Sequence, residues 1–210
     1  MNYYQDITLL PEVDIPLSFI WPKVFQQVHI ALVDNKLDKN QSAVAVSFPE
    51  FKQTRFPLGA KLRLFATEQH QLQQLNIANW LNRLDDYVHV KGIKAVPDPV
   101  KYVRFSRKNV KSPERIEKDM QEKAKRWSDK SGLSMAESLQ QLAKTKPQAN
   151  CDLPFIFLHS QETKRRSPDK SSQFPLFIQM ERVNEPLFGT FDCYGLSFAQ
   201  ADKQATVPWF

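Results

Sequence analysis

In the first hundred residues, segments with hydrophobic residues at helical spacing follow segments in which hydrophobic and polar residues alternate as in strands. This pattern predicts six secondary-structure elements. Apolar residues between positions 17 and 32 recur at helical intervals, whereas the neighbouring segments alternate as strands do. The predicted elements are strands at 3–10, 42–48, 61–66 and 87–96, and helices at 17–32 and about 68–84, the second with Leu72, Leu75, Ala78, Trp80 and Leu81 facing inward. The order βαββαβ is that of a ferredoxin-like domain, an antiparallel four-stranded sheet covered by two helices.

Pro97 and Pro99 are predicted to end this domain at residue 97, because proline restricts both its own backbone and that of the residue before it. A smaller α+β domain would then occupy residues 98–210. It begins with a basic strand at 101–108, followed by Ser112-Pro113-Glu114, a strong start for a helix over about 113–130. The pattern further predicts a short helix after a capping box at Ser134–Glu137, strands at 153–159, 174–181 and 191–196, and a mobile loop at 163–172.

Charge is concentrated in one part of this second domain. Residues 101–130 contain eleven Lys and Arg against five Asp and Glu, and this excess of six equals the net charge of the whole chain. A polyanion would therefore meet one localised basic patch, and nucleic acid is the first partner to expect. The alternative is that the charged helix is simply a solvated surface.

Composition excludes several classes of protein. No apolar run is long enough to span a membrane and the N-terminus does not resemble a signal peptide, so a cytoplasmic protein is expected. Cys151 and Cys193 form no metal-binding motif, and no glycine-rich phosphate loop is present. We therefore expect no metal, no nucleotide and no other cofactor.

His29 is the strongest candidate for chemistry among the four histidines. It lies at the edge of the predicted apolar stripe, where an imidazole would be half shielded, and its ordinary pKa near 6.5 suits a general base. A packed or solvated structural histidine is the alternative. His159 and Ser160 are adjacent, but neighbouring residues of a strand point to opposite faces, which disfavours a catalytic pair.

Seven segments together resemble the CRISPR repeat-processing endoribonucleases of subtype I-F systems. They are FQQVHIALV around His29, VSFPEF at 46–51, SRKNVKSPERI at 106–116, DLPFIFLHSQ at 152–161, FPLFI at 174–178, CYGLS at 193–197 and the terminal VPWF at 207–210. The resemblance extends over nearly the whole chain.

The resemblance implies a reaction and a set of residues. Members of this family bind the stem-loop of a CRISPR repeat transcript and cut at its 3′ base without metal. The upstream 2′-hydroxyl attacks the phosphodiester, which leaves a 2′,3′-cyclic phosphate and a 5′-hydroxyl. By resemblance, His29 is the base, Ser160 holds the 2′-hydroxyl and Tyr194 orients the imidazole. Arg107 and Asn109 would read base edges, Phe174 would stack on the terminal base pair, and Arg115, Lys118 and Lys123 would face the RNA groove.

Some positions depart from the family pattern. Asp119 and Glu122 replace two arginines on the basic helix, and they either pair with Lys123 and Arg126 or weaken the hold on the RNA. Glu162 replaces a small hydroxyl residue near Ser160. Two hypotheses remain: an endoribonuclease that stays on its product and joins the other subunits of the type I-F surveillance complex, or a hairpin-binding subunit without catalysis.

Overall fold

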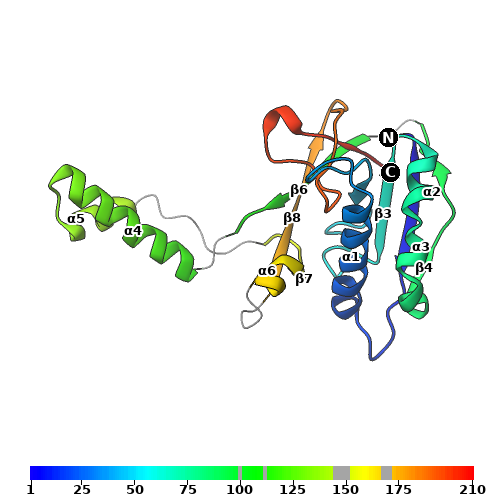
Figure 1. Cartoon of the computed structure of the whole chain (residues 1–210), viewed down its shortest axis with the longest axis horizontal. Coiled ribbons are helices and arrows are strands. Elements are labelled where there is room, and N and C mark those ends of the chain that lie inside the picture. Colours follow the sequence, from blue (N-terminus) through cyan, green and yellow to red (C-terminus); the bar gives the residue numbers. More distant parts are fainter. Residues whose placement is uncertain (99–100, 111–112, 144–151, 167–171) are drawn as a thin grey trace. The chain divides into compact units, whose positions relative to one another are not determined.

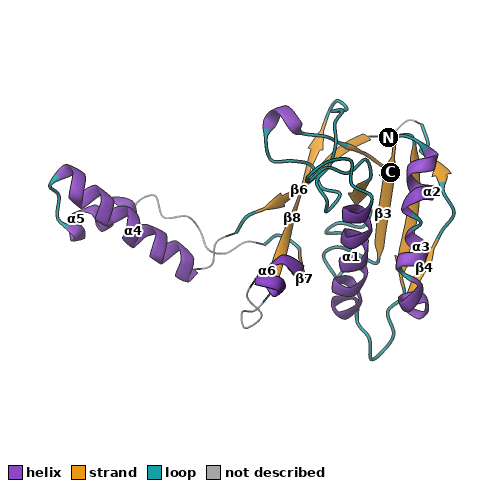
Figure 2. Cartoon of the chain, in the orientation of Figure 1, coloured by secondary structure: helices purple, strands orange, loops and turns teal. Residues whose placement is uncertain are grey.

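The computed structural model describes residues 1–98, 101–110, 113–143, 152–166 and 172–210, without the side chains of residues 113 and 161–163. Helices and antiparallel sheets make up the described chain, which confirms the α+β class (Figures 1 and 2). Contacts divide it into two compact units, residues 1–108 with 154–210 and residues 109–153. The predicted domain division after residue 97 stays a prediction.

The first sheet of the larger unit is built around β1 (Tyr3–Leu9). Its strand order is β2-β3-β1-β4, every pair is antiparallel, and the short β5 also pairs with β1. The other strands are β2 (Ala45–Ser47), β3 (Lys61–Ala66), β4 (Val88–Val90) and β5 (Lys94–Ala95). The predicted strands are thus present, although 87–96 forms two short strands instead of one.

Helix α1 (Leu17–Asp34) buries the apolar stripe that its sequence predicts. Seven of its side chains are buried: Ile20, Trp21, Val24, Phe25, Val28, Ala31 and Leu32. The Trp21 indole donates a hydrogen bond of 2.8 Å to the Gly59 carbonyl, so its polar atom is satisfied inside the core. The apolar face of α1 is therefore packed in the core, and His29 lies at the edge of this buried face.

The second predicted helix is not continuous. Asn76 adopts a left-handed conformation with φ of 45°, which ends α2 (Gln69–Leu75) before α3 (Ile77–Trp80) and a 3-10 segment at Asn82–Tyr87. The break shifts the helical phase, so that Ile77 is buried and Ala78 is exposed. The prediction that Ala78 faces inward was wrong for this reason.

A second antiparallel sheet of the same unit has the strand order β7-β8-β6-β9. Its strands are β6 (Lys101–Lys108), β7 (Phe155–His159), β8 (Gln173–Val183) and β9 (Val207–Trp209). The predicted strand at 191–196 was wrong, because this segment forms a turn. The predicted loop at 163–172 was wrong in part, since α6 (Gln161–Arg166) covers its first residues; residues 167–171 lie outside the described chain.

Both sheets of the larger unit share one core. Phe105 of β6 is buried and contacts the rings of Phe48 and Phe51 edge-on, at centroid distances of 5.3 and 5.6 Å. Phe48 also packs against Trp21 and Phe25 of α1. The continuous packing holds α1 and the second sheet together around the candidate site.

The smaller unit contains α4 (Pro113–Ser131) and α5 (Met135–Ala143). The predicted helix beginning at residue 113 is confirmed, while Ser112 lies outside the described residues. The predicted capping box is also confirmed, since the Ser134 amide donates to Glu137 Oε2 at 2.9 Å and the Glu137 amide donates to Ser134 Oγ at 3.2 Å. No helix in the described part of the chain is long and apolar enough to cross a membrane.

Candidate functional site

Asp192 shapes the turn that brings the candidate residues together. Its Oδ1 accepts hydrogen bonds from the backbone amides of Tyr194 and Leu196, at 2.8 and 2.9 Å. Its own amide donates to the Leu196 carbonyl, and its carbonyl accepts from the Gly195 amide, both at 2.8 Å. A side chain that binds nearby backbone amides stabilises a turn at the expense of a strand. These bonds explain why the alternating sequence at 191–196 does not extend.

The turn is anchored to the rest of the larger unit on both sides. The Val46 amide donates to the Gly195 carbonyl at 2.8 Å, and the Ser197 amide donates to the Phe105 carbonyl at 2.8 Å. Gly195 has φ of +71°, and a Cβ atom there would lie 2.4 Å from Val46 Cγ2. Only glycine fits this position, because both the backbone conformation and the space exclude a side chain.

His29 is held by this turn through two contacts. Its Nδ1 lies 2.8 Å from the Cys193 carbonyl oxygen, and its ring stacks on that of Tyr194, with centroids 4.1 Å apart and planes within 9°. A carbonyl oxygen only accepts, so Nδ1 carries a proton and donates it. In the neutral imidazole this leaves Nε2 as the acceptor. The arrangement fixes both the tautomer and the orientation of the ring.

Burial shifts the protonation of three groups at this centre. It lowers the pKa of His29, against an opposing effect of the Cys193 carbonyl, and therefore favours the neutral imidazole. It raises the pKa of Asp192 to about 6, although the two backbone amides and Arg107 favour the carboxylate. It also raises the pKa of Tyr194, which keeps the phenol protonated. The centre thus combines a neutral imidazole with an uncharged phenol.

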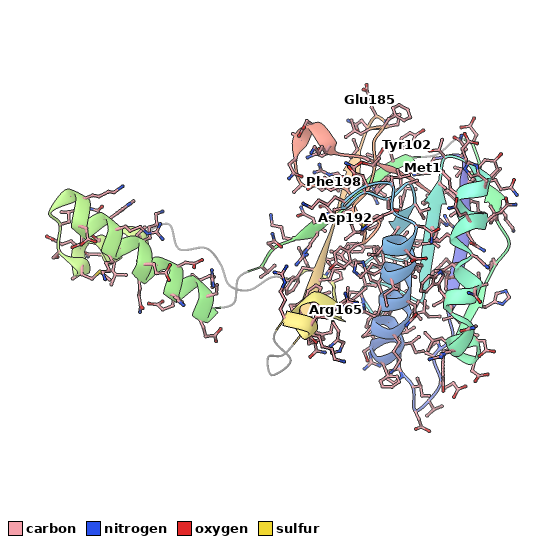
Figure 3. All side chains as sticks on the ribbon, in the orientation of Figure 1. Met1, Tyr102, Arg165, Glu185, Asp192 and Phe198 are labelled. Carbon is pink, nitrogen blue, oxygen red and sulfur yellow. The ribbon has the colours of Figure 1, made fainter. Side chains whose placement is uncertain are left out.

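Arg107 of β6 lies near the aromatic rings of two more of the predicted residues. Its guanidinium carbon lies 5.5 Å from the centre of the Phe174 ring and 5.9 Å from that of Tyr194. The Arg107 side chain is exposed and Phe174 is half-buried. Figure 3 labels Asp192 beside α1. Arg107, Phe174, Tyr194 and His29 therefore form one contiguous series of contacts.

Ser160 follows directly after β7, whose end is tied to α1. The His159 amide donates to Gln26 Oε1 at 3.0 Å, and the Ser160 amide donates to the Ser172 carbonyl at 2.8 Å. Gln26 precedes His29 by one helical turn, so both residues belong to the same stretch of α1. The side chain of Glu162 lies outside the described part of the structure, and its effect on His29 stays untested.

The remaining predicted RNA-binding residues belong to the smaller unit. Asn109 and, on α4, Arg115, Lys118 and Lys123 are all exposed. Asp119 pairs with Arg115, Nε to Oδ1 at 3.1 Å, and Glu122 pairs with Arg126 at 3.8 Å. Glu122 thus has the expected partner, and Asp119 has an ion pair with Arg115, one turn earlier on the helix. Lys123 lies over the Trp127 ring, with Nζ 5.3 Å from its centre.

No three His, Cys, Asp or Glu side chains of the described residues come together as metal ligands would, and the described Cys193 is a free, buried thiol.

Sequence reasoning missed Asp192 and the Cys193 carbonyl. A carboxylate three residues before a glycine, as in DCYG, is the signal of a side-chain-capped turn that could have revealed Asp192.

The chain is similar to known proteins over nearly its whole length. A family model described as CRISPR-associated protein (Cas_Csy4) matches residues 4–210. The chain belongs to this family. It is also 33% identical, over 211 residues and the full length of both chains, to the CRISPR-associated endonuclease Cas6/Csy4 of Pseudomonas aeruginosa strain UCBPP-PA14. Both units of this Csy4-family chain lie within the match, apart from its first three residues.

Proposed function

We propose that the protein is a CRISPR-associated endoribonuclease that cleaves precursor RNA at the 3′ base of the repeat hairpin. The observation that carries this proposal is the pairing of His29 Nδ1 with the Cys193 carbonyl, which leaves Nε2 as a proton acceptor. Family membership and the similarity to a named endonuclease support the same reaction class.

The proposed reaction balances with one protein base and needs no redox partner. His29 Nε2 takes the proton of the RNA 2′-hydroxyl, and the resulting oxygen attacks the adjacent phosphorus. The bond between phosphorus and the 5′ oxygen breaks, and that oxygen takes a proton from solvent. The products are a 2′,3′-cyclic phosphate and a 5′-hydroxyl. Because the nucleophile belongs to the RNA, the protein contributes positioning and proton transfer, and we propose that neither metal nor nucleotide takes part.

Two residues are proposed to position the reacting groups. Tyr194 holds the imidazole plane by stacking, which its 9° interplanar angle supports. Ser160 binds the 2′-hydroxyl, a role supported by the link between the end of β7 and α1. Neither residue needs to be charged for these roles, which agrees with the raised pKa of Tyr194.

Recognition is proposed to use both units. Arg107 and Asn109 read base edges beside the cut, and Phe174 stacks on the terminal base pair of the stem. Arg115, Lys118 and Lys123 contact the phosphates of the hairpin from α4, as their exposure permits. We further propose that residues 1–97 form a ferredoxin-like domain, which the strand order β2-β3-β1-β4 supports.

After cleavage, the protein is proposed to remain on its product hairpin and to join the other subunits of a type I-F surveillance complex. A cytoplasmic location goes with this role. The decisive experiment incubates the protein with its repeat hairpin in EDTA, next to an RNA with one 2′-deoxy nucleotide just upstream of the cut. Cleavage of the ribose form alone, with a cyclic phosphate product, supports the endonuclease. Binding of both RNAs with cleavage of neither would indicate a non-catalytic hairpin-binding subunit.

A further inference from the structure

A groove of the larger unit runs beside the candidate centre and has no role in the reaction above. It lies along the first half of α1, between α3 with the 3-10 segment on one side and the end of β7 on the other, and its volume is ≈ 850 Å³. Figure 1 shows α1 with β7 beside it, and α1 contacts both β7 and α3. This volume lies near the upper end of the range typical of ligand sites.

Aromatic side chains line both walls of the groove and are open to solvent. Phe19 of α1 is 54% exposed and Phe157 of β7 is 43% exposed, while Trp80 of α3 is half-buried. Phe157 continues into a row of rings on the same sheet face, 5.1 Å from Phe155, which lies 5.3 Å from Phe177. Exposed aromatic rings on a sheet are a common platform on which unpaired bases stack.

The charges of the groove select the kind of ligand. Lys23 and Arg83 line it and are exposed, and no Asp or Glu is among its described lining residues. Lys23 Nζ lies 4.6 Å from the centre of the Phe19 ring, so a cation and a stacking surface occur together. Amide side chains such as Gln27 and Asn79 add donors and acceptors for base edges. Cations beside aromatic rings, without carboxylates, favour a single-stranded polyanion.

Two residues that line the groove are close in sequence to residues of the proposed cleavage centre. His159 lines it, and the next residue is Ser160; Gln26 also lines it, one turn before His29 on α1. RNA on the 3′ side of the cut lies outside the hairpin and is unpaired, so its bases are free to stack. A strand leaving the scissile phosphate along α1 would enter this groove.

We propose that the groove binds the unpaired RNA segment immediately 3′ of the cleavage site, an inference that rests on the proposed function. Phe19 and Phe157 stack on its bases, and Lys23 and Arg83 bind its phosphates. The contact belongs to the substrate and is lost from the retained product, because cleavage separates this segment from the hairpin. Substrate would therefore bind more tightly than product, and the released 3′ fragment would dissociate.

The test compares two hairpin RNAs that carry a 2′-deoxy nucleotide at the cut. One ends a single nucleotide past the cut, and the other continues for about six nucleotides, close to the lower site sizes of single-strand binding modules. We expect the longer RNA to bind the wild-type protein at least about fivefold more tightly, as one stacked base would give. Phe157→Ala and the double variant Lys23→Ala/Arg83→Ala should reduce this ratio towards one.

Phe188→Ala is the matched aromatic control, because Phe188 is 87% exposed and does not line the groove; Lys39→Ala, also exposed and outside the groove, is the matched charge control. Both should keep the wild-type ratio. Equal binding of the two RNAs by the wild-type protein would overturn the proposal and leave the groove for a protein partner. A loss of both affinities in equal proportion, or a ratio that falls in the controls, would overturn it as well.

Two readouts keep this proposal separate from its premise. Cleavage of the short all-ribose hairpin tests the proposed function and does not require the groove. Photocrosslinking of the long RNA, with 5-iodouridine placed in the tail, tests occupancy without a mutation. An adduct on α1 or β7 of the groove supports the proposal, and adducts confined to other elements contradict it.

Discussion

The polar groups around His29 are fixed by the backbone and by ring stacking, whereas two arginines of α4 are exposed and pair with carboxylates one turn away on the same helix. His29 has its tautomer set by the Cys193 carbonyl and its plane set by Tyr194. Arg115 and Arg126 instead form i,i+4 ion pairs, and their side chains are 65% and 72% exposed. Exposed pairs of this kind contribute at most about 1 kcal/mol.

Under the proposed function, this difference separates the catalytic step from the binding of RNA. A proton transfer requires one atom at one place, so the loss of a single fixed group should abolish most of the rate. Phosphate binding sums many exchangeable contacts, so that each lysine matters a little and salt matters a great deal. The predictions below test whether the two regions really respond in these different ways.

The largest effect is expected from His29→Ala. Loss of a general base costs a factor of about 10²–10⁴ in rate, so single-turnover cleavage should fall by that amount while hairpin affinity stays within about threefold. Gel-based cleavage and binding assays measure both quantities. His70→Ala, at an exposed histidine on α2, is the matched control and should keep the wild-type rate. A His29→Ala protein that cleaves normally would remove the basis for the proposed mechanism.

Gly195→Ala should disrupt the turn that holds His29. The change meets both a left-handed φ and the Val46 side chain, so we expect unfolding free energy to fall by about 2 kcal/mol or more and cleavage to fall at least about tenfold. Urea unfolding and single-turnover kinetics measure the two effects.

Two other glycines separate the causes. Gly132 also has a positive φ, of +69°, but open space around it, and Gly92 has neither restriction. Gly132→Ala should therefore lower the unfolding free energy only by the backbone strain, and Gly92→Ala should lower it very little. Equal losses in all three variants would show that contact with Val46 is unimportant.

The sequence predicts the features of these two regions that depend on residues close together in the chain. The helix that begins at residue 113 and the capping box at Ser134 depend on residues within one turn, and both were predicted correctly. The prediction of the apolar stripe of α1 also depended on local spacing, and it was correct. The break at Asn76 was missed, because asparagine is compatible with a helix until its left-handed conformation is seen.

The candidate centre could not be predicted from local pattern. His29 and Cys193 are 164 residues apart, and no periodicity connects them. The residues Phe191 to Leu196 alternate as a strand does, yet the Asp192 carboxylate captures the amides that a strand would use. Only the resemblance to a family associated His29 with Tyr194, and it did not indicate Asp192.

Neutralising one lysine of α4 should have a smaller effect than either change at the centre. Lys118→Ala should weaken hairpin binding a few-fold and lower the slope of log affinity against log salt by about one. The cleavage rate of fully bound RNA should stay at the wild-type value, because the proposed mechanism gives α4 no part in proton transfer. Filter binding at several salt concentrations gives the slope. A large loss of rate on saturating RNA would mean that the two regions are not independent.

The last prediction concerns the pH dependence of stability through Asp192, with no change in RNA binding required. Its pKa is raised from 3.8 to about 6 in the folded protein, so between these values the folded state binds a proton that the unfolded state releases. The resulting stabilisation is fully present below 3.8 and is lost as the pH rises through 6. Asp192→Asn keeps an oxygen that can accept from the Tyr194 and Leu196 amides but cannot titrate.

Urea unfolding of the wild-type protein and of Asp192→Asn across this pH range isolates the contribution of Asp192. The wild-type protein should lose stability relative to the variant as the pH rises from about 4 to about 7. Asp192→Ala, which removes the acceptor, should instead lose cleavage activity at every pH. Asp192→Asn could instead lose as much cleavage activity as Asp192→Ala. That result would mean that the negative charge of Asp192 near Arg107, and not its hydrogen bonds in the turn, positions His29. The fixed region would then depend on electrostatics as α4 does.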